Sequence, residues 1–200
     1  MPSRRSLIFA LTVLLVALAS GAAALWFVPV GGPVSSGTPL VGGPFALTDH
    51  NGNRVTDKTY AGKYLLIFFG YTYCPDVCPS ELQVMSAALD QLGPDAEKIQ
   101  PLFISIDPAR DTPQALKDYV SNFNSRLIGL TGSDQDIAAV ASKYRVYYAK
   151  AKTNDSTADY LMDHSTILYL MRPDGTFLKH FTYGTDAKAL ADGIRQAMDS

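Results

Sequence analysis

The sequence predicts an α/β fold with a mixed central β-sheet flanked by helices, an N-terminal β-hairpin and, ahead of these, an N-terminal transmembrane anchor. Two patterns lead to this prediction. Short apolar runs alternate with stretches of helical spacing along the middle of the chain, and a long uncharged segment lies near the start. The 200 residues, 47% hydrophobic and 18% charged, are enough for one packed domain and an appendage.

The N-terminal segment, residues 1–28, predicts export across a membrane. Residues 7–28 carry no charge, and as a helix they would span roughly 33 Å, enough to cross a bilayer core. Arg4 and Arg5 precede this run and no basic residue follows before Arg54, so the positive-inside rule places the domain outside the cytoplasm. A cleaved signal peptide is the alternative and also exports the domain. We expect a single-pass protein of a bacterial inner membrane with its domain in the periplasm.

Composition separates the remaining parts of the chain. Residues 29–44 are rich in Gly, Pro and Ser and predict a linker, so the folded domain is expected to cover residues 45–200. The net charge is −2 and no basic patch stands out, which argues against a nucleic-acid partner. With two cysteines in all, the chain is not a disulfide-stapled scaffold.

The first half of the domain alternates strands and helices. Its predicted strands are an opening hairpin and two buried apolar runs: 45–48 with 54–56, 63–69 and 102–106. Between the last two, Pro79 fits the first position of a helix, with Cys78 as its N-cap and Glu81 completing a capping box. Gly93 and Pro94 end that helix.

The second half continues the alternation and closes with a hairpin. Thr112 opens a second helix before Pro113, and Ser133 caps a third that runs to Tyr144. The other predicted segments are strands at 127–130, 145–151, 165–171 and 176–183, a polar loop at 153–159 and a last helix at 186–198. This order is that of an α/β sandwich with helices on both faces of the sheet.

Cys74 and Cys78 lie together on the loop between a predicted strand and a predicted helix. A cysteine pair at this place is typical of a thioredoxin-like fold. Because a helix N-terminus lowers the pKa of a thiol, Cys78 is expected to be more thiolate-like than a free cysteine. Thiolates select Cu(I), zinc or iron–sulfur clusters, and two of them under-fill a stable copper or zinc site. A third ligand is therefore expected from elsewhere.

Three histidines are candidates for that ligand. His50 lies in a hairpin turn and is expected to be exposed, and His180 fits a half-buried structural position in an alternating strand. His164 directly precedes the strand 165–171, in the loop that packs against the cysteine loop of thioredoxin-like sheets. We take His164 as the best third ligand, with Asp163 as an orienting neighbour, although the residues alone leave a structural role equally open.

Three motifs follow one another along the chain: Cys74-Pro-Asp-Val-Cys78-Pro79, Asp107-Pro-Ala-Arg110-Asp-Thr-Pro113 and Asp163-His164-Ser165. Together they resemble the Sco/SenC family of copper-binding, thioredoxin-like proteins, and the resemblance covers about residues 45–200. It implies that Cys74, Cys78 and His164 bind one copper ion, as Cu(I) or Cu(II). It also implies a metallochaperone that assists assembly of the copper centre of cytochrome c oxidase, by copper delivery, cysteine reduction or both. The implied partners are that oxidase subunit, other copper chaperones and thioredoxin-like reductants.

Other residues near these motifs have less specific interpretations. Many family members carry another residue, often His, before the first cysteine, whereas Tyr73 stands here and supplies no imidazole. Asp107 and Arg110 are expected to order the loop after a strand, with a role in partner docking left open. Met162 could be a soft axial ligand, but packing is the favoured role.

An exported thiol–disulfide oxidoreductase is the main alternative function. General oxidoreductases use two residues between their cysteines, and this chain has three. A peroxidase of the peroxiredoxin type needs an arginine beside its cysteine, and the sequence places none there. A purely structural disulfide is disfavoured because so short a loop gains little from closure, whereas a reversible Cys74–Cys78 disulfide is expected outside the cytoplasm.

Overall fold

The structure, a computed structural model, describes residues 41–151 and 160–200. The predicted anchor at 1–28, the linker up to residue 40 and the predicted loop at 153–159 lie outside these residues. Within the described ranges, no helix is both long and apolar enough to cross a membrane.

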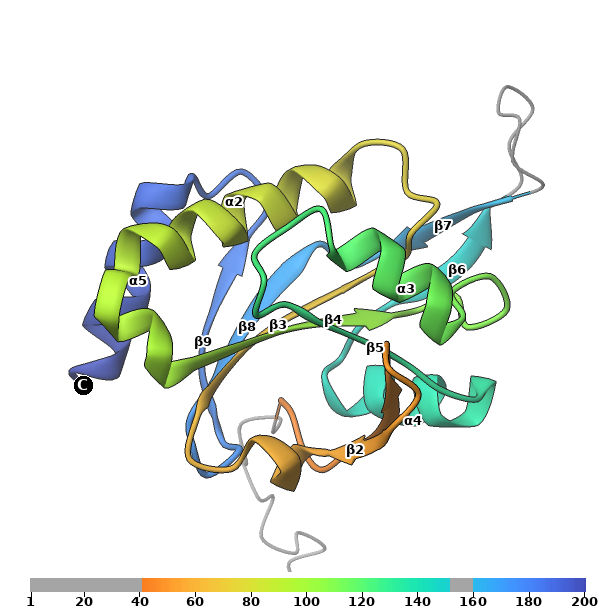
Figure 1. The fold of residues 1–200 in the computed structure, drawn as a ribbon, viewed down its shortest axis with the longest axis horizontal. Coiled ribbons are helices and arrows are strands. Elements are labelled where there is room, and N and C mark those ends of the chain that lie inside the picture. Colours follow the sequence, from red (N-terminus) through yellow and green to blue (C-terminus); the bar gives the residue numbers. More distant parts are fainter. Residues whose placement is uncertain (1–40, 152–159) are drawn as a thin grey trace, which may run out of the picture. The chain divides into compact units, whose positions relative to one another are not determined.

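The described part of the domain is built on a seven-stranded mixed sheet with the strand order β2-β1-β5-β4-β3-β8-β9 (Figure 1). Its strands are β1 (Ala46–Asp49), β2 (Arg54–Thr56), β3 (Tyr64–Gly70), β4 (Ile99–Ser105), β5 (Ile128–Thr131), β8 (Ile167–Met171) and β9 (Phe177–Thr182). The strands β3, β4 and β5 are parallel, and the other neighbours are antiparallel. The predicted mixed sheet and opening hairpin are therefore confirmed.

Helices cover both faces of this sheet, as predicted. They are α2 (Val77–Leu92), α3 (Pro113–Val120), α4 (Asp134–Lys143) and α5 (Ala187–Met198), with short 3-10 helices η1 (Asp57–Tyr60) and η2 (Gly93–Lys98). Successive residues of β3 point to opposite faces. Phe68 packs on Phe103, whose ring meets Tyr119 of α3, whereas Phe69 packs on Tyr144 at the end of α4.

The strand β3 lies in the interior of the sheet, between β4 and β8. Residues 65–70 are all buried, as the apolar run predicted, because both faces of the strand are covered. The cysteine loop follows directly from the last residue of this strand, Gly70, and leads into α2. The loop is thus held at both ends by rigid elements.

The helix after the cysteine loop begins earlier than predicted. Asp76 is the N-cap, so Cys78 lies inside the first turn, and the predicted capping box is absent. The reason is that the sulfur of Cys74 already accepts the free N–H of Cys78, at 3.3 Å. Glu81 is buried instead, and this burial raises the pKa of its carboxylate.

A strand that the sequence pattern did not reveal carries His164. This strand, β7 (Leu161–His164), pairs antiparallel with β6 (Tyr148–Ala151), which is shorter than the predicted strand at 145–151. His164 lies opposite Tyr148 at the end of this ladder. The prediction that His164 lies in a loop was wrong because β7 is only four residues long and its pairing, not its composition, defines it.

Candidate metal centre

The two cysteines face the same small space from different positions. Cys74 is half-buried on the loop, and Cys78 is fully buried in the first turn of α2. Both are free thiols. The N–H of Cys74 donates to the carbonyl of Tyr71, at 3.3 Å, and closes a turn that brings the Cys74 sulfur to the start of the helix. The loop therefore presents both sulfur atoms from a backbone of fixed shape.

The imidazole of His164 completes the cluster. Its Nε2 lies 3.4 Å from the sulfur of Cys78, and its Nδ1 lies 3.0 Å from the carbonyl oxygen of Ser165. When Nδ1 donates its proton to that carbonyl, Nε2 is left free to accept a proton or bind a metal. The rings of Phe68 and Tyr71 meet the imidazole edge-on, at centroid distances of 6.1 and 6.0 Å.

The three donor atoms suit one soft metal ion. They lie within 4.8 Å of one another, close to the greatest separation that one ion with bonds of about 2.0–2.3 Å can bridge. Two thiols and one imidazole are the donors that copper and zinc prefer over calcium or magnesium. The structure thus brings Cys74 and Cys78, four residues apart around the start of α2, together with His164 of β7, which lies 86 positions after Cys78.

The environment assigns the negative charge to Cys74 and not to Cys78. A hydrogen bond from the thiol of Cys78 lowers the pKa of Cys74 to about 4, with a further contribution from His164. That same hydrogen bond and burial raise the pKa of Cys78. The prediction that Cys78 is more thiolate-like than a free cysteine was wrong, because the hydrogen bond to Cys74 and burial raise the pKa of Cys78 above its ordinary value.

The other two histidines lie away from this cluster. His50 was predicted to be exposed, but it is half-buried, and its Nδ1 accepts the N–H of Gly129 at 3.0 Å. His180 was predicted to be half-buried, but it is exposed on β9 and stacks on Phe177. Both have local structural contacts, and neither belongs to the Cys74–Cys78–His164 group.

A buried hydrogen-bond network supports the cysteine loop from behind. The carboxylate of Asp111 accepts bonds from the hydroxyl of Thr72, at 2.6 Å, and from its backbone N–H, at 3.1 Å. It also accepts a bond from the hydroxyl of Ser105, at 2.6 Å. Burial raises the pKa of Asp111. The roles of Thr72 and Ser105 could not be predicted from the sequence, because single hydroxyl residues carry no pattern that would distinguish them.

The predicted supporting residues have different contacts. Asp107 is buried and forms an ion pair with Arg110, which fits their predicted role of ordering the loop after β4. Arg110 also contacts Tyr160, a residue that no sequence pattern connects to it. Asp163 is exposed, and the ring of His164 is held by the carbonyl of Ser165. Met162 is buried and packs beside the cluster.

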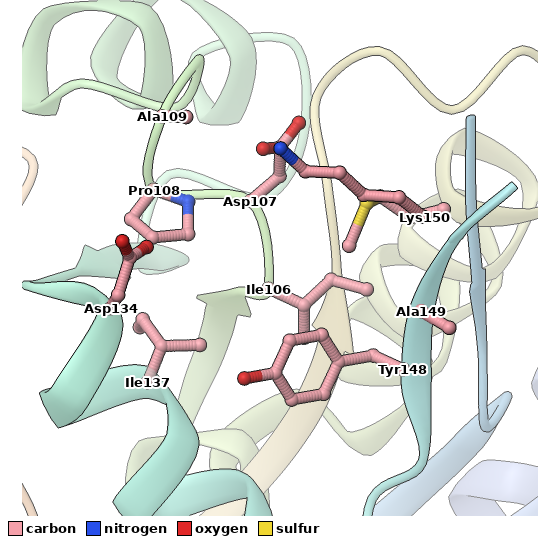
Figure 2. A pocket seen from close by; sticks show the side chains of 10 residues that line it. Ile106, Asp107, Pro108, Ala109, Asp134, Ile137, Tyr148, Ala149 and Lys150 are labelled. Atoms are coloured by element: carbon pink, nitrogen blue, oxygen red, sulfur yellow. The ribbon is translucent and has the colours of Figure 1, made fainter. Parts of the chain in front are cut away.

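Two hollows lie near the cluster. One, of about 250 Å³, is lined by Cys74, His164, Asp76, Asp163 and Met162 among others, so Cys74 and His164 are open to a partner. The second, of about 140 Å³, shares Met162 but contains no cysteine or histidine. Figure 2 shows Ile106, Ile137 and the ring of Tyr148 around this second hollow, with Asp107 and Lys150 toward one end. It contains none of the three candidate ligands, whereas two of them, Cys74 and His164, line the first hollow.

Comparisons with known proteins agree with this geometry. The chain is 51% identical to the human mitochondrial SCO1 homolog over 150 residues, which are 72% of this chain and 48% of that protein. It therefore spans about half the length of that relative. The crystal structure of Arabidopsis thaliana ScoI with copper bound shares 44% identity, with a TM-score of 0.75 over 80% of this chain and 98% of the other.

Two further structures extend the comparison. Bradyrhizobium japonicum ScoI with copper bound is 48% identical, with a TM-score of 0.71 over 78% of this chain and 99% of the other. The structure of BsSco, a member of the Sco family of cytochrome c oxidase assembly proteins, has a TM-score of 0.63 over 85% of this chain and 98% of the other. Its sequence identity is only 23%, so this likeness concerns the fold alone. The thioredoxin-like α/β fold is confirmed.

The family profile described as SCO1/SenC matches residues 34–199, which include both cysteines, His164 and every described strand and helix. The chain therefore belongs to the SCO1/SenC family.

Proposed function

We propose that this protein is a membrane-anchored copper chaperone that binds one copper ion through Cys74, Cys78 and His164. The observation that carries the proposal is the cluster itself, in which two thiols and one imidazole lie within 4.8 Å of one another. Copper in homologous ScoI structures supports the choice of metal. In this role copper is cargo: soft donors bind it, and an open coordination position lets a receiving protein compete for it.

The geometry suits a site that both holds and releases its metal. Cys78 is buried and fixed in the first turn of α2, whereas Cys74 and His164 line an open hollow. A partner's thiol or imidazole can therefore approach from the side of Cys74 while Cys78 stays in place. We propose the copper-centre subunit of cytochrome c oxidase as the receiver, on the basis of family membership.

The proposed cellular arrangement follows from the sequence. Residues 1–28 anchor the chain in the bacterial inner membrane, residues 29–44 are the linker, and residues 45–200 form the periplasmic domain. The uncharged run at 7–28 and the two arginines before it support this arrangement. Protease treatment of spheroplasts tests it: external protease should degrade the domain, and protection of the domain would contradict it.

The copper proposal is tested by titrating the purified full-length chain, reduced and in detergent micelles, with Cu(I). We expect one copper per chain, and we expect Cys74→Ala, Cys78→Ala and His164→Ala each to weaken binding strongly. An unchanged affinity in His164→Ala would remove the imidazole from the site. Binding of less than one copper per chain by the wild type would contradict the proposal itself.

A second candidate function, reduction of a partner's disulfide, is favoured by the low pKa of the half-exposed Cys74. The Cys74 thiolate would attack the partner's disulfide, and the Cys78 thiol would then displace the partner. Two electrons pass to the partner, which leaves as a dithiol, and a Cys74–Cys78 disulfide remains. His164 has no required role in this exchange, so its removal separates the functions. Turnover of a disulfide substrate by His164→Ala would support the reductase.

A further inference from the structure

We propose that Arg110 is a positioning residue of the metal centre: it holds the strand that carries His164 against the cysteine loop, and tight copper binding depends on it. This inference rests on the proposed function, because it concerns the affinity of the same site. Arg110 lies in the loop after β4, outside the three ligands and outside the elements that carry them.

The need for such a residue follows from the topology. The strands β6 and β7 form a two-stranded sheet that is separate from the seven-stranded sheet among the described residues. The end of β7 at His164 continues through two residues into β8, which pairs with β3. In the part of the chain that the structure describes, the beginning of β7, at Leu161, has no such backbone ladder to the main sheet. Side-chain contacts must fix it there.

The guanidinium of Arg110 supplies contacts to both sides of the site. Its Nη1 donates to the carbonyl of Tyr160, the residue before β7, at 3.0 Å. The Cζ atom lies 3.7 Å from the ring centroid of Tyr160 and 4.6 Å from that of Tyr73, both within the range of cation–π attraction. Because Tyr73 is the neighbour of Cys74, one side chain links the cysteine loop to the start of the strand that carries His164.

Asp107 fixes Arg110 in this position. Its Oδ2 accepts the Nε–H of Arg110, and its Oδ1 accepts the hydroxyl of Tyr160 at 2.8 Å. Asp107 is itself buried, and its backbone N–H donates to the hydroxyl of Ser105. Because Asp107 holds one edge of the guanidinium and the ring of Tyr160 stacks on its face, the orientation of the guanidinium is fixed. A flexible lysine ammonium cannot reproduce its planar arrangement of N–H donors.

A purely local role, in which Arg110 only orders its own loop, predicts a different result in a double-mutant cycle. If Arg110 acts through His164, removing His164 abolishes the effect of changing Arg110 on copper binding. If it acts only on its loop or on overall stability, the effect persists without His164. The decisive variants are therefore Arg110→Lys, His164→Ala and the double variant, compared with the wild type.

The experiment measures Cu(I) affinity of these four full-length proteins by competition with a chromophoric chelator. We expect Arg110→Lys to weaken binding by roughly 10- to 100-fold, as for other residues that orient metal ligands. In the His164→Ala background the same change should alter affinity by less than about twofold. In the metal-free protein, hydrogen exchange of the β7 amides should accelerate in Arg110→Lys. Arg54→Lys is the matched control, since Arg54 pairs with Asp136 through two bonds on the edge strand β2 and should leave both measurements unchanged.

Two outcomes overturn this inference and leave the proposed function standing. In the first, the wild type binds copper and Arg110→Lys binds it with the same affinity. In the second, Arg110→Lys loses the same affinity whether His164 is present or replaced by alanine. Failure of the wild type to bind copper overturns the proposed function as well. Should Arg110→Lys fail to fold, Tyr160→Leu takes its place in the cycle, because it removes the stacked ring and keeps Arg110 and Asp107. The same loss, dependent on His164, is expected from Tyr160→Leu, and its absence contradicts the proposal.

Discussion

Replacing Gly70 by alanine is expected to damage the metal site through one added methyl group. Gly70 ends β3, and a Cβ built there would lie 2.9 Å from the sulfur of Cys78 and 2.8 Å from the ring of Phe103. Contacts below 3.0 Å force a shift. To restore an ordinary contact distance of 3.4 Å from the added Cβ, the sulfur of Cys78 would have to move by roughly 0.5 Å. This displacement is about the largest that a set of metal ligands tolerates in the position of one member.

Two magnitudes follow from this clash. Overpacking a core costs about 1–3 kcal/mol, so the midpoint of thermal unfolding should fall by about 2–4 °C for each kcal/mol in a domain of this size. Cu(I) affinity should fall at least about tenfold, because Cys78 is fully buried and its sulfur cannot be displaced without losing its place beside His164. Circular dichroism measures the first quantity, and chelator competition measures the second.

Gly129→Ala is the matched control for this prediction. Its Cβ would meet Val120 and Leu116 of α3 at 3.1 and 3.2 Å, so it also overpacks the core, but it touches no ligand. We expect a loss of stability with wild-type copper affinity. Wild-type copper affinity in folded Gly70→Ala, or an equal loss of affinity in Gly129→Ala, would contradict the predicted effect on the site.

Two further predictions concern charge. In the reduced, metal-free protein at pH 6, iodoacetamide should modify Cys74 before Cys78. The reason is that a pKa of about 4 leaves Cys74 as a thiolate, whereas Cys78 is buried and its pKa is raised. Peptide mass spectra measure the order of labelling, and earlier labelling of Cys78 would contradict this prediction. Asp136→Ala should lower the free energy of unfolding at pH 7 by about 1 kcal/mol, because Asp136 accepts two bonds from Arg54 and caps α4 with Ser133. Since the bonds from Arg54 lower the pKa of Asp136 from 3.8 to about 2, this stabilisation is present above about pH 4 and is lost as the pH falls toward 2. Urea unfolding of the wild type and the variant at both ends of that pH range measures this stabilisation. A difference in the free energy of unfolding that does not change with pH would contradict the prediction.

The parts of the fold that follow from local pattern could be predicted from the sequence. The buried strands β3 and β4 are continuous apolar runs, and the caps Thr112, Ser133 and Asp186 accept hydrogen bonds at the starts of their helices. Such features depend on residues within a few positions of one another. They are therefore visible before any tertiary contact is known.

The parts that were missed depend on contacts distant in sequence. The strand β7 exists through its pairing with β6, and the charge on Cys74 depends on hydrogen bonds that form only when the loop is folded. The contact between Arg110 and Tyr160 joins residues 50 positions apart. Cys74, Cys78 and His164 could be named together because the three motifs resemble a family, whereas their spacing alone left the role of His164 open.

The ligand set of the copper ion can be read directly by X-ray absorption at the copper edge of the Cu(I)-loaded full-length protein. We expect two sulfur atoms and one imidazole nitrogen around each copper, with the nitrogen scattering lost in His164→Ala. A wild-type spectrum with sulfur ligands only, or one unchanged by His164→Ala, would contradict the site formed by Cys74, Cys78 and His164.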